Sequence, residues 1–336
     1  AMHSAVNGMA DAATFRGYPP ERGYDFLIDK ILKYDFAARG ITLERDEIFI
    51  SDGAKSDTGS IGDIFSPECK VAVCDPVYPV YIDTNIMAGR GGKPLENGRF
   101  SNIAYLDCTA ENGFIPPLPE QNVDIIYLCS PNNPTGTVAG KEYMRGLIEH
   151  NPQVCFIIDQ SYEFFTLCPL FSPEEAVEYS NVLLLHSMTK RYAVPGLRLG
   201  YVTGNSGLLV RLRTNRMPWS VNQLAIEAGL FLLEHDVPNP LDVAAYLEET
   251  ARLSAAIQAI GGLEVWVTQT HFMLVQLRIG KASALKDYLA GEHGILIRDA
   301  SNFTGLNEQF FRIATQTPEE NDRLVAAIAK FMSSDL

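Results

Sequence analysis

The sequence predicts an α/β protein built on a mainly parallel sheet of seven strands between helices, followed by a smaller α+β region. Two observations lead to this prediction. From residue 46 to about 204, short runs of apolar and β-branched residues alternate with helix-like stretches. The runs are apolar throughout and do not alternate with polar residues, which is typical of strands covered on both faces. A parallel sheet is favoured because each parallel connection needs a crossover such as a helix.

Each expected strand is a short run that can be identified directly. The runs are EIFI at 47–50, KVAVCD at 70–75, NIAYLD at 102–107, VDIIYLCS at 123–130, VCFIID at 154–159, NVLLLHS at 181–187 and LRLGYV at 197–202. In such sheets, ligands bind beyond the carboxyl ends of the strands. The polar segments SDGAK, DPVYP, SPNNPTG, DQSY and SMTK follow five of these runs. We therefore expect a functional site where these segments meet.

The pattern becomes helical after about residue 205, with helices expected at 208–216, 222–234 and 242–259. Strands and helices then alternate through GLEVWVTQTHFMLVQL, KASALKDYLAGEH, ILIRDA, FFRIAT and a last helix at 319–331. We expect a large domain at 11–235 and a small domain formed by 1–10 and 236–336. Met2, Val6 and Met9 recur at helical spacing with no capping residue before them, so we expect a preceding N-terminal segment to be missing.

Composition excludes several classes of function. The 336 residues include 27 Lys and Arg against 41 Asp and Glu, a formal net charge of −14, which disfavours nucleic acid and anionic membrane surfaces as partners. The six cysteines form no CxxC pair, and no apolar run is long enough to span a membrane, so a cytoplasmic location is expected. The six histidines lack the spacing of metal ligands, and no metal site is expected.

Two basic residues in SMTKRYAVPGLR indicate a cofactor. Lys190 follows Ser187 and Thr189 at the end of an expected strand, and Arg198 lies eight residues further on. An amine for an imine bond and a cation for a phosphate are what pyridoxal 5'-phosphate requires. Asp159 ends the apolar run VCFIID, where an ionised carboxylate is costly unless it pairs with a cation such as a pyridinium nitrogen.

Further residues supply the remaining contacts of such a cofactor. Asn133 in PNNPTG and Tyr162 in DQSY can donate hydrogen bonds to the phenolate oxygen of its ring. Tyr78 in DPVYP offers an aromatic face for stacking. The backbone N–H groups of Ala54 and Lys55, where a helix starts after SDG, can hold a phosphate.

With PNNPTG, Asp159 followed by Tyr162, and S-x-T-K-x₇-R, the chain resembles the fold type I pyridoxal-phosphate enzymes of the class I/II aminotransferase family. The resemblance implies that Lys190 binds the cofactor covalently and that Asp159 pairs with its ring nitrogen. It also implies a homodimer with shared active sites. The residues implied to bind the phosphate are Ala54, Lys55, Ser187, Thr189 and Arg198, assisted by Tyr18 of the partner subunit. Arg312 in FFRIAT matches the arginine that binds the substrate carboxylate.

Two parts of the chain resemble different branches of this family. Residues 14–137 resemble LL-diaminopimelate aminotransferase, in which Glu21 and Lys55 would help to recognise the distal end of the substrate and Asn222 could reach across the dimer interface. Residues 154–330 resemble threonine-phosphate decarboxylase and histidinol-phosphate aminotransferase. This pattern fits both a natural mosaic and an engineered chimera of the two branches. Because the branches act on different substrates, the resemblance does not select one substrate.

The leading hypothesis is an aminotransferase that moves an amino group from an amino acid of the LL-diaminopimelate or histidinol phosphate type to a 2-oxo acid. The alternative enzyme is a decarboxylase of L-threonine-O-3-phosphate in cobalamin biosynthesis, suggested by DQSY and ILIRDASNF. A binding or regulatory module is disfavoured because Lys190, Asp159 and Arg198 are all present. A nucleotide-binding function is disfavoured because no GxGxxG or GxxxxGK[ST] follows a strand.

Overall fold

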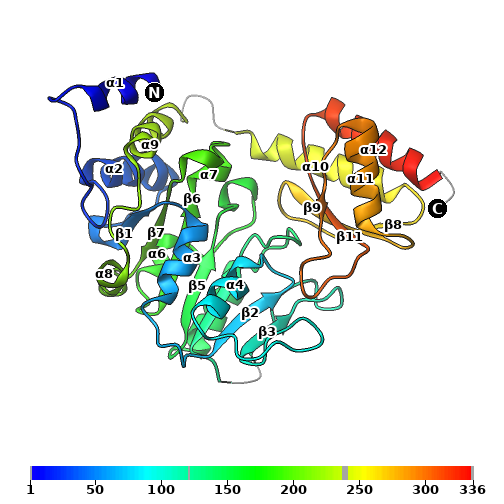
Figure 1. Ribbon diagram of the computed structural model, residues 1–336, viewed down its shortest axis with the longest axis horizontal. Coiled ribbons are helices and arrows are strands. Elements are labelled where there is room, and N and C mark those ends of the chain that lie inside the picture. Colours follow the sequence, from blue (N-terminus) through cyan, green and yellow to red (C-terminus); the bar gives the residue numbers. More distant parts are fainter. Residues whose placement is uncertain (1, 120–121, 237–240, 334–336) are drawn as a thin grey trace.

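The computed structural model describes residues 2–119, 122–236 and 241–333. It confirms the expected α/β fold, with a seven-stranded sheet in the order β1-β7-β6-β5-β4-β2-β3 (Figure 1). The strands are β1 (Ile48–Ser51), β2 (Val71–Asp75), β3 (Ile103–Asp107), β4 (Ile125–Cys129), β5 (Cys155–Asp159), β6 (Val182–Ser187) and β7 (Gly200–Gly204). All seven expected runs therefore form strands of one sheet.

The five strands from β2 to β6 run parallel, while β7 lies antiparallel between β1 and β6. Every residue of β2, β4, β5 and β6 is buried, which explains the continuous apolar runs. The run expected to start at Leu197 becomes a strand only at Gly200. Arg198 has a φ of 59°, a left-handed conformation that interrupts extended chain.

Helices cover both faces of this sheet (Figure 1). They are α2 (Asp25–Lys30), α3 (Ala54–Gly62), α4 (Val80–Met87), α5 (Lys141–His150), α6 (Pro173–Ala176), α7 (Met188–Arg191), α8 (Ser206–Asn215) and α9 (Gln223–Asp236). No helix in the described part of the chain is both long enough and apolar enough to cross a membrane. The six cysteines are free thiols, of which Cys69 and Cys168 are only partly buried.

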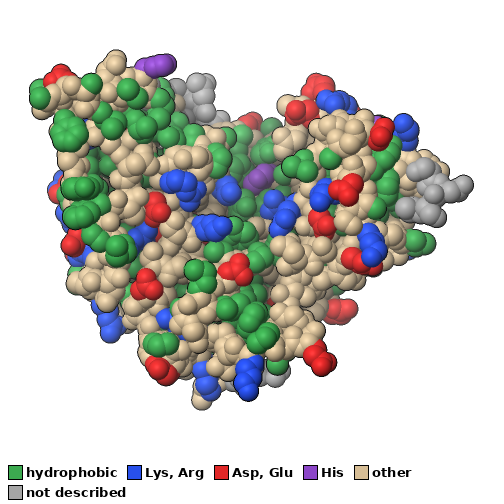
Figure 2. All heavy atoms as spheres, viewed as in Figure 1, with side chains coloured by type: hydrophobic (Ala, Val, Ile, Leu, Met, Phe, Trp, Pro, Cys, Tyr) green, Lys and Arg blue, Asp and Glu red, His purple; other side chains and the backbone are tan. Residues whose placement is uncertain are grey.

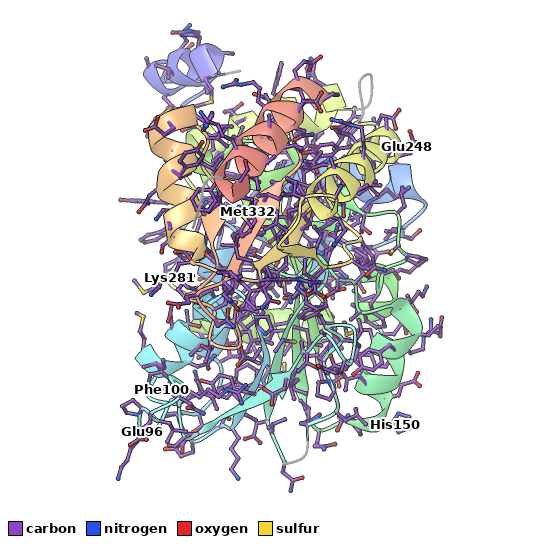
Figure 3. All side chains as sticks on the ribbon, turned by 90° about the vertical axis from the view of Figure 1, so that its right-hand side faces the viewer. Glu96, Phe100, His150, Glu248, Lys281 and Met332 are labelled. Atoms are coloured by element: carbon purple, nitrogen blue, oxygen red, sulfur yellow. The ribbon has the colours of Figure 1, made fainter. Side chains whose placement is uncertain are left out.

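The C-terminal region, residues 241–333, has its own antiparallel sheet in the order β10-β11-β9-β8. Its elements are α10 (Val243–Gln258), β8 (Leu263–Val265), β9 (Phe272–Leu277), α11 (Ala282–His293), β10 (Arg298–Asp299), β11 (Phe310–Ala314) and α12 (Pro318–Ser333). Figure 3 shows the three helices on the outer side of this sheet, with Met332 near the end of α12. The boundary expected at 235/236 stays a prediction, because residues 237–240 lie outside the described residues.

The two faces of the small sheet pack against different cores. Along β9, Met273 and Val275 join the apolar core formed with α10, α11 and α12, whereas Leu274 joins the core of the large sheet. Alternate side chains of a strand point to opposite faces. Arg312 lies opposite both Leu274 and Arg298 in the register, so both arginines share the face that is turned toward the large sheet.

The opening helix α1 (Met2–Ala10) does not join the C-terminal region, in contrast to the expectation for residues 1–10. It packs against α9, with Ala5 as its buried residue, on the far side of the molecule from the small sheet (Figure 1). An ion pair of 3.1 Å between Arg16 and Glu227 also holds the following segment against α9. This contact between distant parts of the chain explains why the helical pattern alone gave the wrong location.

Candidate active site

A cavity of about 750 Å³ lies between the large sheet and the small sheet. Figure 2 shows Lys and Arg side chains gathered around the hollow between the two lobes. The cavity is lined by Ala54, Lys55, Ser56, Tyr78, Tyr81, Cys129, Asn133, Asp159, Ser161, Tyr162, Ser187, Thr189, Lys190, Arg198, Arg298, Phe303 and Arg312. The expected residues from SDGAK, DPVYP, SPNNPTG, DQSY and SMTK thus meet in one place.

Lys190 presents its amine to this cavity from α7, directly after β6. Its pKa is lowered by burial and by the neighbouring charges of Arg312 and Arg198, while Asp159 acts in the opposite direction. A lowered pKa increases the fraction of neutral amine, which is the nucleophilic and proton-accepting form.

Asp159 ends β5 with its carboxylate buried beside the cavity. Oδ2 accepts a hydrogen bond of 2.7 Å from the Tyr81 hydroxyl, and Oδ1 accepts one of 2.8 Å from the Ser161 N–H. Neither donor is charged, and Asp159 makes no ion pair within the described part of the chain. A buried carboxylate held by neutral donors is suited to a cationic partner in the cavity, such as a pyridinium nitrogen.

Sequence reasoning missed Tyr81. The available signal was the position of Tyr81 three residues after Tyr78, at the start of an expected helix. Its hydrogen-bond acceptor, Asp159, lies 78 positions further along the chain. In the structure the two rings meet edge to face, with centroids 6.2 Å apart, and Tyr78 lines the cavity as expected.

An anion-binding cradle forms where α3 begins. Gly53 precedes α3 with a φ of 110°, and a Cβ at this position would lie 2.9 Å from Arg198 Nη2. The glycine thereby keeps open the space between the first N–H groups of the helix and the guanidinium. Ser187 Oγ and Thr189 Oγ1 lie 2.8 Å apart on the cavity wall. Backbone N–H groups, hydroxyls and a guanidinium together fit a phosphate group.

Arg312 reaches the cavity from β11. Its Nη1 donates a hydrogen bond of 2.5 Å to Asn133 Oδ1, and its buried Nε has no partner among the described residues. The bond orients the Asn133 amide so that Nδ2 remains to donate to a ligand. Burial raises the pKa of Tyr162 to about 12 despite the nearby Arg312, so this hydroxyl keeps its proton and can also donate.

Arg298 and Phe303 were not expected at the site. Arg298 lies opposite Arg312 in the β10–β11 register, and both guanidinium groups line the cavity. A signal existed in the sequence, since both arginines occur in short apolar runs of the C-terminal region. The antiparallel pairing of these runs, which places the two cations side by side, could not be deduced from either run alone.

Three expected site residues lie outside the cavity. Tyr18 is 78% exposed and stacks on Trp219, with ring centroids 4.4 Å apart. Glu21 lines a separate small pocket, together with Tyr24 and Trp219. Asn222 precedes α9, where its Oδ1 accepts from the Ala225 N–H at 2.9 Å, as a helix cap does.

The family of the chain emerges from comparison with known proteins. The family model described as "Aminotransferase class I and II" matches residues 1–328. The LL-diaminopimelate aminotransferase of Parabacteroides distasonis is 47% identical over 207 residues, which cover 60% of this chain and 50% of that protein. The chain spans about half the length of the curated relatives that it matches.

Solved structures agree with this assignment over nearly the whole chain. The crystal structure of L-threonine-O-3-phosphate decarboxylase from Porphyromonas gingivalis has a TM-score of 0.84 and 27% identity, covering 99% of this chain and 94% of that chain. L,L-Diaminopimelate aminotransferase from Chlamydomonas reinhardtii has a TM-score of 0.80 and 25% identity, covering 99% and 86%. Both resemblances noted in the sequence are thereby confirmed, and this chain belongs to the class I and II aminotransferase family.

Proposed function

We propose that this chain is an aminotransferase that acts with pyridoxal 5'-phosphate, the cofactor on which its family depends. The observation that supports this best is the cavity in which the amine of Lys190, the cradle at Gly53 and Arg198, and the carboxylate of Asp159 lie together, and this carboxylate makes no ion pair among the described residues. An amino acid would donate its amino group, and a 2-oxo acid would accept it.

Each group around the cavity has a separate task in this proposal. The cradle of α3, Ser187, Thr189 and Arg198 binds the phosphate, and Asp159 keeps the ring nitrogen protonated. When bound, the cofactor supplies an electron sink for the substrate α-carbon. Lys190 Nζ would accept the proton from that carbon and donate it to the cofactor carbon on the other side of the imine nitrogen, and the lowered pKa of Lys190 favours the neutral amine that accepts it.

The substrate end of the cavity favours a donor with a second anionic group. Arg312 retains donors for an α-carboxylate beyond its bond to Asn133. Arg298, on the neighbouring strand, offers a second cation. A diaminopimelate-type carboxylate or a phosphate such as that of histidinol phosphate would fit this cation.

Decarboxylation of L-threonine-O-3-phosphate is the second candidate. It is favoured by the likeness to the Porphyromonas gingivalis decarboxylase over 99% of this chain and by the same second cation. The two reactions differ in which bond of the substrate α-carbon breaks, the bond to hydrogen or the bond to the carboxylate, and Arg312 would influence this choice through the orientation in which it holds the carboxylate.

A cytoplasmic homodimer is part of the proposal. Tyr18, Met217 and Trp219 are 78%, 82% and 55% exposed, and such large side chains are typical of interface residues. Tyr18 and Asn222 would then contribute to the site of the other protomer. The free thiols, most of them buried, are consistent with a reducing compartment.

The test mixes purified protein, loaded with pyridoxal 5'-phosphate, separately with LL-diaminopimelate, histidinol phosphate and L-threonine phosphate in the absence of a 2-oxo acid. Lasting loss of the cofactor's visible absorbance band with one donor would support transamination, because the amino group then stays on the cofactor. Recovery of the band with release of carbon dioxide from threonine phosphate would establish the decarboxylase instead.

Substitution of the lysine provides the internal control. Lys190→Ala should lower turnover by a factor of roughly 10² to 10⁴, the usual contribution of a general acid–base group, or more. Lys33→Ala removes an exposed lysine away from the cavity and should leave turnover unchanged. Full turnover by Lys190→Ala would refute the proposed function.

A further inference from the structure

The loop that joins β10 to β11 carries one wall of the cavity. Its flanking strands belong to the small sheet, yet Ala300 and Phe303 are buried in the apolar core of the large sheet. Phe303 also lines the cavity. The loop therefore crosses from one sheet to the other, and its position determines the shape of the cavity at the end where the arginines lie.

The position of the Arg298 side chain depends on contacts with the same loop. Its Nη2 donates a hydrogen bond of 2.9 Å to Asn302 Oδ1, and its guanidinium carbon lies 5.7 Å from the centre of the Phe303 ring. A displacement of residues 300–306 would thus move both the aromatic wall and the second cation. In contrast, Asp159 ends β5 of the large sheet and Lys190 follows β6, and within the described residues neither side chain makes a hydrogen bond to this loop.

Asp75, at the end of β2, holds this loop from the other side. Its Oδ1 accepts a hydrogen bond of 2.5 Å from the backbone N–H of Gly305, and its Oδ2 accepts from Arg99 Nε at 3.1 Å and Nη2 at 2.8 Å. The Asp75 side chain is 2% exposed. A Cβ at position 305 would lie 2.6 Å from Oδ1, so this close approach requires glycine.

The positive charge of Arg99 compensates the negative charge of the buried Asp75 carboxylate. It also pairs with Asp107, the exposed end of β3, and its guanidinium carbon lies 4.7 Å from the centre of the Tyr105 ring. Figure 3 shows Phe100, the neighbour of Arg99, below the C-terminal region. Asp75 thus joins the large sheet to a loop 230 positions away without lining the cavity itself.

We propose that Asp75 is a positioning residue that fixes the substrate end of the cavity through the backbone of Gly305. This inference rests on the proposed function, because it assigns the Arg298 and Phe303 end to the amino donor. Loss of the contact releases the loop, so the enzyme binds its donor more weakly, while the cofactor groups stay in place. The effect falls on KM for the donor and spares cofactor affinity and kcat.

The experiment compares variants of the cofactor-loaded enzyme. Asp75→Leu removes the acceptor, whereas Asp75→Asn keeps an oxygen that can accept from Gly305. Asp107→Asn is the matched control, since it alters the other partner of Arg99 without touching the loop. The readouts are KM and kcat for the donor, the dissociation constant of the cofactor, and hydrogen–deuterium exchange of residues 300–306.

We expect Asp75→Leu to raise the donor KM about tenfold or more and to accelerate exchange in the loop, with cofactor affinity unchanged. Asp75→Asn and Asp107→Asn should stay within about threefold of the wild type. Gly305→Ala should reproduce the effect of Asp75→Leu from the loop side, which keeps the test decisive if Asp75→Leu does not fold.

Two results would overturn the inference. One is unchanged exchange of residues 300–306 in the folded Asp75→Leu or Gly305→Ala variant. The other is an equal loss of cofactor affinity and donor KM, which would indicate general damage to the fold. A wild-type enzyme that turns over no amino donor would refute the proposed function alone, and the exchange measurement would still decide whether Asp75 holds the loop.

Discussion

His271 offers a quantitative test of the electrostatics around the cavity. Its ring lies among aromatic side chains, with centroids 4.0 Å from Phe165 and 5.7 Å from Tyr246. Burial lowers its pKa from 6.5 to about 4, and the positive charges of Arg312 and Lys190 act in the same direction. The histidine is therefore neutral in the folded protein near pH 7.

The magnitude follows from linkage between protonation and folding. Because the pKa is lower in the folded state, the unfolded chain binds the additional proton between pH 6.5 and pH 4. The contribution of neutral His271 to the stability of the folded protein is therefore complete above pH 6.5 and is lost as the pH falls from 6.5 to about 4. A shift from 6.5 to about 4, at about 1.4 kcal/mol per unit, makes the contribution of His271 about 3 kcal/mol between pH 7.5 and pH 4.

The measurement is the free energy of unfolding in urea, at pH 7.5 and pH 4, of protein without added cofactor. His271→Phe keeps an aromatic ring in the stack but cannot titrate, so the variant should lose about 3 kcal/mol less than the wild type on acidification. His150→Phe, which replaces an exposed histidine on α5, should behave as the wild type does. Equal losses for His271→Phe and the wild type would refute the reasoning.

Two further predictions concern the elements behind the site. Gly53→Ala places a Cβ against Arg198 and strains the backbone, which has a φ of 110° at this position. The affinity for the cofactor, measured by titration, should therefore fall by about tenfold or more. Gly59→Ala is the control, because a Cβ there meets only ordinary van der Waals contacts and should leave the affinity unchanged. Arg216→Met removes the ion pair of the fully buried Asp57 and should lower the free energy of unfolding by about 3–5 kcal/mol, a loss that adding Asp57→Asn should partly restore.

The fold was predictable because its signals are local. Strands covered on both faces need continuous apolar runs, and this requirement marked all seven strands of the large sheet. The left-handed Arg198, which delays the start of β7 to Gly200, carries no such signal. The location of α1 was not predictable either, because a short helix with a few apolar residues can pack in several places.

The candidate site was predictable where its residues follow strand ends. Asp159 ends an apolar run, Asn133 and Lys190 follow such runs within a few residues, and parallel strands bring their carboxyl ends to the same edge of the sheet. Tyr81 and Arg298 were missed because their roles depend on which strands are neighbours. Sequence spacing does not reveal strand order.

The sequence by itself determined the fold class, the family and the chemical groups of the cofactor site, since apolar runs and strand-end motifs are read within a few residues. Only the tertiary structure decided how those groups are held. The bonds from Tyr81 to Asp159, from Arg312 to Asn133 and from Gly305 to Asp75 join residues 78, 179 and 230 positions apart. Such contacts depend on strand order and on the packing of one sheet against the other, which no local pattern encodes.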